Sequence, residues 1–334
     1  MTSIRRMNSI EVRDLSKTYT TYKRGSGFAD VLKSVFVRET QEVRALKGIS
    51  FDVEEGELIG FLGPNGAGKS TTLKVLTGVL HPTSGSVDAL GFCPWKQRKR
   101  YVANIGAVFG QKSQLIWDIP PMDSFLMNQA IYGIPDGKFK ETLAELSSML
   151  GVEELMKRPT RNLSLGERMK CEFIMAMLHR PRVVFLDEPT IGLDVIAKET
   201  IRAFILRMNA AGVTFILTTH DLADVESLAR RVIVVNHGEL VFDDTLERLR
   251  SYFGSRKRIR LVTASPVADL GLPGLEETGR ESDTDIAYEL DLAMTPLNRF
   301  IARANERAEI RDMSIEEIPI ERVIKDLYEK KNGS

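Results

Sequence analysis

Residues 63–71 combine the residue types and the spacing best suited to holding phosphate. They read Gly-Pro-Asn-Gly-Ala-Gly-Lys-Ser-Thr, which matches the pattern G-x-x-x-x-G-K-[ST] at every fixed position. The glycines let the backbone close around phosphate oxygens with its N–H groups directed at negative charge. Lys69 would reach the β- and γ-phosphates, and the Ser70 hydroxyl would bind Mg²⁺. The pattern therefore predicts a nucleoside triphosphate site rather than a structural glycine-rich turn.

Two adjacent carboxylates supply the residues that hydrolysis of such a ligand needs. Asp187 and Glu188 directly follow the apolar run Val183-Val184-Phe185-Leu186. In this arrangement Asp187 could hold the metal ion and Glu188 could polarise an attacking water. The pair therefore predicts two separate roles for neighbouring acids.

A third polar stretch, Asn162-Leu163-Ser164-Leu165-Gly166-Glu167-Arg168, opens a predicted helix that runs through Met169 to His179. The Ser164 hydroxyl and the Gly166 amide could form a second anion site. Because the phosphate loop already covers one side of the nucleotide, this second site would meet a γ-phosphate presented from outside the chain.

Buried strands are expected to position these groups. Leu58–Leu62 is a continuous apolar run, as in a strand buried on both faces of a parallel sheet, and 72–76 can continue as a helix after the loop. The run 183–186 predicts a second buried strand, and 214–217 predicts a third.

Taken together, the motifs resemble ATP-binding cassette (ABC) proteins, in their order, over about residues 10 to 245. The resemblance rests on Walker A at 63–71, Gln111, a signature-like turn at 163–167, Walker B at 183–188, Gly192-Leu193-Asp194 and His220. It implies an α/β P-loop NTPase cassette with a RecA-like mixed sheet core, an antiparallel β subdomain and an inserted helical subdomain. A small C-terminal α+β appendage is expected to follow.

The resemblance also implies roles for single residues. Tyr19 matches the aromatic that stacks on adenine, Gln111 the residue that links Mg²⁺ and the attacking water to the helical subdomain, and His220 the residue that contacts the γ-phosphate. Asp194 matches the loop aspartate that communicates across a nucleotide-bound dimer. Taken alone, Tyr19 could be half-buried packing, Gln111 a surface loop residue and His220 a hydrogen bonder at a strand end.

The expected site therefore has three groups of residues, which overlap. The catalytic group is Glu188, His220, Lys69 and Gln111; the metal ligands are Ser70, Gln111 and Asp187; the nucleotide contacts are Tyr19, Gly63, Pro64, Asn65, Gly66, Ala67, Gly68, Lys69, Ser70, Thr71, Ser164, Gly166 and Asp194.

The signature turn departs from the family form Leu-Ser-Gly-Gly-Gln at Leu165 and Glu167. Leucine forbids the freer φ values of glycine, so the turn must use ordinary helical or extended angles. The carboxylate of Glu167 would repel a nearby triphosphate unless it pointed away or paired with Arg168 or Arg161. We favour the outward orientation over a degenerate signature that makes no contact.

The sequence predicts a nucleotide-binding domain over 1–254 and an accessory domain over 255–334. Within the first, apolar residues at helical spacing predict an inserted amphipathic helix over 28–39, which would cover the sheet edge or touch a membrane partner. The segment 112–162 resembles the family's helical subdomain, where Trp117, Phe125 and Met127 are either permease contacts or core. The end of the chain, from Ser314 to Ile324, resembles the terminal segment of ATPases paired with ABC-2-type exporter permeases.

The composition of the chain restricts which partners it can bind and where in the cell it is expected. Lys+Arg and Asp+Glu are both 46, so no global field draws the chain to nucleic acid. The absence of a stretch of about 18 apolar residues predicts a cytosolic chain. The family resemblance implies a peripheral protein, held at the cytoplasmic face of the membrane by a permease.

We predict the ATP- and Mg²⁺-dependent ATPase subunit of an ABC transporter, of the ABC-2 exporter type. It would work as a head-to-tail dimer, in which a homodimer is expected, with integral-membrane permease subunits. The alternatives are a soluble cassette ATPase acting on ribosomes or DNA, and a regulator that binds ATP without cleaving it. One set of motifs and no sustained heptad pattern argue against the first, and Glu188 and His220 argue against the second.

Overall fold

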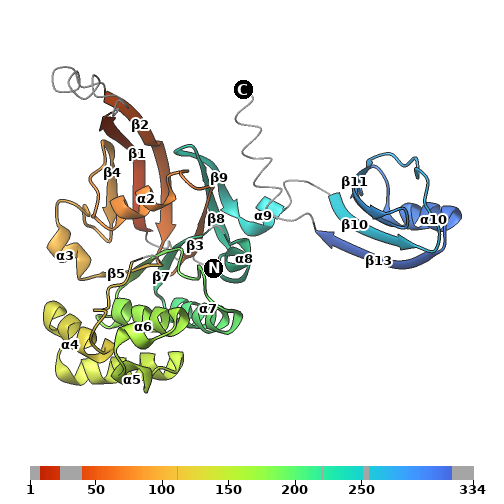
Figure 1. Ribbon diagram of the computed structural model, residues 1–334. Helices are drawn as coiled ribbons and strands as arrows, with labels where there is room; N and C mark the ends of the chain where they lie inside the picture. Colours follow the sequence, from red (N-terminus) through yellow and green to blue (C-terminus); the bar gives the residue numbers. More distant parts are fainter. Residues whose placement is uncertain (1–7, 23–39, 111, 220, 251–255, 318–334) are drawn as a thin grey trace, which may run out of the picture. The chain divides into compact units, whose positions relative to one another are not determined.

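The computed structural model describes residues 8–22, 40–110, 112–219, 221–250 and 256–317 (Figure 1). The chain divides into two compact units, Met1–Asp244 and Thr245–Ser334. No helix among the described residues has the length and apolar character needed to cross a bilayer.

A six-stranded sheet forms the centre of the first unit (Figure 1). Its order is β5-β6-β7-β3-β8-β9, and the pairs from β5 through β8 are parallel. The bounds are β3 Leu58–Leu62, β5 Ile105–Phe109, β6 Val183–Asp187, β7 Thr214–Thr218, β8 Arg231–Asn236 and β9 Glu239–Thr245. The buried strands β3, β6 and β7 are the apolar runs that the sequence predicts.

Helices cover both faces of this sheet, which is why the central strands β3, β6 and β7 are apolar and buried. On one face, Phe61 of β3 shares a buried cluster with Leu73 and Leu76 of α2 (Lys69–Leu76). On the other, a Cβ added to Gly60 would lie 3.0 Å from Val225 of α8. The remaining helices of the unit are α3 Arg98–Val102, α4 Pro121–Tyr132, α5 Asp136–Leu150, α6 Leu165–Met177, α7 Val195–Ala210 and α8 Leu222–Leu228, with short 3-10 turns at Leu155–Lys157 and Thr160–Asn162.

A second, antiparallel sheet has the order β2-β1-β4. β1 (Asn8–Tyr22) and β2 (Thr40–Glu54) form a long ribbon, and β4 (Ser84–Ala89) pairs with β1. The end of β1, 18–22, is rich in β-branched and aromatic residue types, which favour extended backbone. The inserted helix predicted over 28–39 lies outside the described residues.

The helices α4 and α5 lie together beside α6 (Figure 1), and both contact it. Phe125 on α4 has no exposed surface, so this side chain belongs to the core and is not a permease contact. Trp117 and Met127 are 51% and 49% exposed. Of the three candidate contacts, therefore, only Trp117 and Met127 are accessible.

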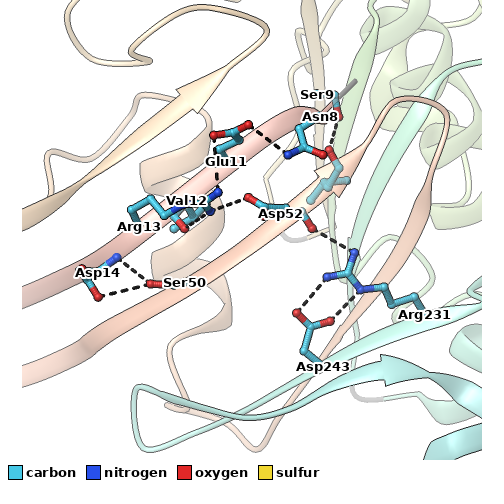
Figure 2. A network of polar contacts seen from close by, with 11 residues as sticks. Asn8, Ser9, Glu11, Val12, Arg13, Asp14, Ser50, Asp52, Arg231 and Asp243 are labelled. Atoms are coloured by element: carbon cyan, nitrogen blue, oxygen red, sulfur yellow. Dashed lines mark hydrogen bonds and ion pairs between the residues drawn. The ribbon is translucent and has the colours of Figure 1, made fainter. Parts of the chain in front are cut away.

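Arg231 joins the two sheets of the first unit (Figure 2). Its guanidinium donates to both carboxylate oxygens of Asp243 on β9, at 2.7 and 2.9 Å, and to the carbonyl of Asp52 on β2, at 3.0 Å. It also contacts Glu57, just before β3, at 3.1 Å. These neighbours raise the pKa of Arg231, with the hydrogen bond to Asp243 as the largest cause.

The second unit is an α+β fold (Figure 1). Its four-stranded sheet has the order β11-β12-β10-β13, and Phe300 and Ala304 of α10 share a buried cluster with Ile259, Leu261 and Tyr288 of the sheet. The bounds are α9 Leu246–Arg250, β10 Arg256–Thr263, β11 Leu275–Ser282, β12 Asp285–Asp291, α10 Leu297–Arg307 and β13 Ile310–Glu317. Residues 318–324 of the predicted terminal segment lie outside the described residues.

Candidate nucleotide-binding site

The Walker A loop (63–71) joins the end of β3 to the start of α2. Gly68 adopts φ +113, and a Cβ there would lie 2.8 Å from the Ala45 carbonyl oxygen, so no larger residue fits. The Lys69 ammonium is buried and donates to the carbonyls of Gly63, at 2.6 Å, and Pro64, at 3.3 Å. Burial lowers the pKa of Lys69, while the nearby Glu188 and Asp187 oppose that shift. The loop thus holds a cation directly beneath the glycine cradle.

Walker B ends at the same edge of the sheet. Asp187 is the last residue of β6, and its Oδ1 accepts from Ser70 Oγ at 3.1 Å and from Thr218 Oγ1 at 2.5 Å. The strands β6 and β7 and the start of α2 therefore meet at one carboxylate, because parallel strands place their carboxyl ends together. Thr218 is a contact that the sequence reasoning missed. Its position at the end of the apolar strand β7 was the available signal.

Glu188 adopts φ +54, an unusual backbone conformation for a residue with a side chain. The neighbouring strand β7 stabilises this conformation, because the Glu188 N–H donates to the Thr218 carbonyl at 2.9 Å. A Cβ on Gly110 would lie 2.1 Å from the Glu188 carbonyl oxygen. Non-glycine residues in such conformations concentrate at functional sites, which supports Glu188 as a reactive group.

A cavity of about 490 Å³ opens at this edge of the sheet. Lys112, which follows Gln111 in the chain, is among the lining residues, and sequence reasoning did not single it out. The lining consists of Pro64, Asn65, Gly66, Ala67, Gly68, Lys69, Ser70, Thr71, Lys74, Val79, Phe109, Gly110, Lys112, Asp187, Glu188 and Ile191. The Walker A and Walker B residues therefore face one space.

Gln111 and His220 lie outside the described residues, but their neighbours are well anchored. The Gly110 N–H donates to the Asp187 carbonyl at 2.8 Å. On the other side, Asp221 accepts from Lys198 of α7 at 2.6 Å, and that hydrogen bond lowers the pKa of Asp221. The two strands that precede these positions, β5 and β7, both pair with β6, and their last residues lie opposite Asp187.

The signature turn (163–167) begins helix α6 with a capping box. Ser164 Oγ accepts from the Glu167 N–H at 3.2 Å, and the Glu167 carboxylate accepts from the Ser164 N–H at 2.8 Å. Sequence reasoning offered an outward Glu167 or a pair with Arg168 or Arg161. The structure instead turns this carboxylate back onto its own helix end, and the spacing S-x-x-E was the signal for it.

Leu165 and Gly166 pack the signature turn against the loop before α7. Leu165 starts α6, as expected for a residue with a Cβ, and a Cβ on Gly192 would lie 3.1 Å from its Cδ2. A Cβ on Gly166 would lie 2.8 Å from Ala197 Cβ. Asp194 caps α7 by accepting from the Ala197 N–H at 2.8 Å. The two family motifs are therefore packed together within one chain.

Among the described residues, five of the predicted nucleotide contacts do not line the cavity, and one of them is Gly63, directly before Pro64. Ser164, Gly166 and Asp194 are not among its lining residues in the part of the chain that the structure describes. Tyr19 is also outside this lining; it lies on β1 opposite Val43, with the Lys17 ammonium 5.3 Å from its ring centroid. The structure brings together Walker A and Walker B, and leaves the signature and Tyr19 elsewhere.

These features define a P-loop nucleotide-binding protein: a glycine cradle between strand and helix, a buried lysine, and two acids at the end of a neighbouring strand. Comparison with known proteins narrows the class. The family model described as "ABC transporter" matches residues 46–191. The chain belongs to the ATP-binding proteins of ABC transporters.

Several curated relatives resemble the chain over most of their length. The ABC transporter ATP-binding protein NatA of Bacillus subtilis is 30% identical over 214 residues, which are 64% of this chain and 87% of the relative. The linearmycin resistance ATP-binding protein LnrL of the same organism is 30% identical, covering 79% and 83%. The daunorubicin/doxorubicin resistance ATP-binding protein DrrA of Streptomyces peucetius is 28% identical, covering 87% and 89%.

Solved structures share the fold. One is cbiO1 from Clostridium perfringens, described as part of the ABC transporter complex cbiONQ, with TM-score 0.59, 25% identity and coverage of 72% of this chain and 90% of that one. Another is a dimeric ATP-binding cassette in a post-hydrolysis state bound to ADP and Pi, with TM-score 0.58, 24% identity and coverage of 71% and 98%. In this family the ATPase subunits dimerise and pair with membrane permeases.

Proposed function

We propose that this chain hydrolyses ATP at the cavity below the Walker A loop and thereby powers an ABC-2-type exporter. One observation carries the proposal. Lys69, Ser70, Asp187 and Glu188 come from two distant parts of the sequence and face a single cavity. A buried cation, a hydroxyl and two acids are the set that phosphoryl transfer to water requires.

The residues divide the chemistry between them. Ser70 Oγ and Asp187 Oδ1 lie 3.1 Å apart, and such oxygen donors suit Mg²⁺, with Gln111 as a further ligand assigned by the family resemblance. Bound Mg²⁺ would neutralise charge on the phosphates. Lys69 would leave the loop carbonyls to bind the β- and γ-phosphates, Glu188 would align or deprotonate the attacking water, and His220 would stabilise charge on the γ-phosphate.

A second copy of the chain is proposed to complete the site. The location of Ser164, Gly166 and Asp194 away from the cavity supports this arrangement, because they would then reach the nucleotide only across a dimer. The dimeric neighbour bound to ADP and Pi gives a precedent for the assembly. Tyr19 is proposed to stack on adenine.

Permease subunits are proposed to dock on the helical part of the first unit and hold the chain at the cytoplasmic face of the membrane. Apolar side chains are exposed there, on α4 and just before it: Ile116, Trp117, Leu126, Met127 and Ile131. Relatives named for linearmycin and daunorubicin/doxorubicin resistance support an exporter. We retain 1–254 as the nucleotide-binding domain, with 28–39 as an inserted helix and 112–162 as the helical subdomain. Residues 255–334 form the accessory domain.

Glu188→Gln tests the proposal directly. The amide keeps the size of the side chain but cannot act as a base, so ATP should still bind while phosphate release is lost and a nucleotide-trapped dimer accumulates on gel filtration. Glu199→Gln, an exposed position on α7, is the matched control and should behave as wild type. Unimpaired hydrolysis by the Glu188 variant would remove this residue from its assigned role.

A further inference from the structure

Helix α6, which begins at the signature turn, carries a buried carboxylate that the mechanism above does not use. Glu172 is 3% exposed and points to the linker segment 113–117, which follows Gln111 in the chain. The carboxylate accepts from the Gln114 N–H at 3.0 Å and from the Leu115 N–H at 3.4 Å. It also accepts a short hydrogen bond from the Ser113 hydroxyl.

These contacts are a strong local constraint, because the linker segment has no helix or strand to satisfy its backbone. Backbone N–H groups need acceptors, and Glu172 supplies one for Gln114. The Leu115 N–H is shared between Glu172 and the Ser113 hydroxyl oxygen, at 3.4 and 3.2 Å, and the Ile116 N–H donates to Ser124 Oγ on α4. Burial raises the pKa of Glu172, whereas the hydrogen bonds from the linker lower it. Burial is the larger effect, so the donors offset only part of the unfavourable burial of this charge.

A second contact lies one helical turn earlier on the same face of α6. The Arg168 guanidinium lies 5.5 Å from the centroid of the Trp117 ring. Positions 168 and 172 are four residues apart and therefore neighbours on the helix surface. The two side chains thus contact both ends of the linker segment, Ser113 and the half-exposed Trp117.

We propose that Glu172 is a positioning residue that locks the linker segment 113–117 to α6, so that the linker and the signature Ser164 move as one body. Ser164 caps the same helix that Glu172 anchors, two turns away. The proposal deepens the proposed function, since it gives the path by which a displacement next to Gln111 or at Trp117 reaches the signature. The hydrogen-bond partners of Glu172, which are Ser113, Gln114 and Leu115, do not line the cavity, so Glu172 is not a catalytic residue.

Two substitutions at this position separate the lock from general stability. In Glu172→Gln the amide oxygen can take the place of Oε1, which accepts from Ser113, Gln114 and Leu115, so the lock should persist. In Glu172→Met a side chain of similar length offers no comparable acceptor. Only the methionine variant should therefore release the linker.

Hydrogen–deuterium exchange of the full nucleotide-free chain measures directly whether the linker segment is held to α6. Peptides spanning 113–117 should exchange at least about tenfold faster in Glu172→Met than in wild type, and at the wild-type rate in Glu172→Gln. Peptides from β6 and β7 report whether the core has loosened. Unchanged linker exchange in the methionine variant, or a glutamine variant as fast as the methionine one, overturns the proposal.

Steady-state ATP hydrolysis then tests positioning. Because the Walker A loop is untouched, Glu172→Met should keep KM for ATP within about twofold while kcat falls about tenfold, and Glu172→Gln should restore kcat. The positioning role is contradicted if, in Glu172→Met, the peptides of β6 and β7 lose as much protection from exchange as the linker does. It is also contradicted if the linker exchanges faster while kcat is unchanged. If the wild-type protein did not hydrolyse ATP, the proposed function would be wrong. The exchange experiment would still test whether Glu172 holds the linker segment to α6.

Discussion

Removing the guanidinium of Arg231 should destabilise the first unit far more than removing that of Arg13, although both contact Asp52 (Figure 2). The Arg231 side chain is 25% exposed, and its partners Asp243 and Glu57 are 21% and 19% exposed. The Arg13–Asp52 pair is 48% and 42% exposed. The comparison tests whether burial, rather than the number of ion pairs, determines their contribution.

The magnitude follows from the surroundings of each pair. Breaking a fully buried ion pair costs about 3–5 kcal/mol, because the remaining charge stays desolvated. The Arg231 group retains some solvent, so we expect Arg231→Met to lower the free energy of unfolding by about 3 kcal/mol, near the lower end of that range. Arg13→Met should be indistinguishable from wild type, because water replaces its contacts.

Urea unfolding followed by tryptophan fluorescence is the appropriate assay. Both tryptophans of the chain, Trp95 and Trp117, lie in the first unit, so the signal reports that unit alone. With an m-value of about 3 kcal/mol/M, Arg231→Met should move the midpoint down by about 1 M. Equal midpoints for Arg231→Met and Arg13→Met would refute the reasoning from burial.

Two further predictions concern the cradle and the helical part of the first unit. Gly68→Ala should weaken ATP binding by at least about tenfold, because its Cβ would meet the Ala45 carbonyl at 2.8 Å and the positive φ adds strain of about 1–3 kcal/mol. Gly133→Ala, also at positive φ but in open space, should leave titrated ATP affinity unchanged. Burial lowers the pKa of the His179 imidazole below its ordinary 6.5. As the pH falls below about 6.5, the unfolded chain therefore binds a proton at His179 more tightly than the folded chain does, and the free energy of unfolding should decrease. His179→Gln should flatten this slope of the urea midpoint between about pH 5 and 6.5, and an unchanged slope would assign it to other groups.

The order of neighbouring residues in the sequence was sufficient to predict the chemistry of the phosphate-binding loop. The glycine spacing of 63–71 and the acids after 183–186 each depend on neighbours in the sequence, and the apolar runs beside them read directly as buried strands. The hairpin at His237-Gly238 was likewise predictable, and both residues adopt the positive φ that such a turn requires. The order of the motifs along the chain then indicated the family, and the family resemblance implied the roles of single residues.

Contacts between distant segments were decided only by the tertiary structure. No local pattern indicates that Leu165 packs on Gly192 or that Phe125 belongs to the core. The same holds for Glu172, a charged residue on a helix that sequence alone would place in solvent. A buried polar group needs partners at specific distances, and only the folded chain determines which groups come close enough.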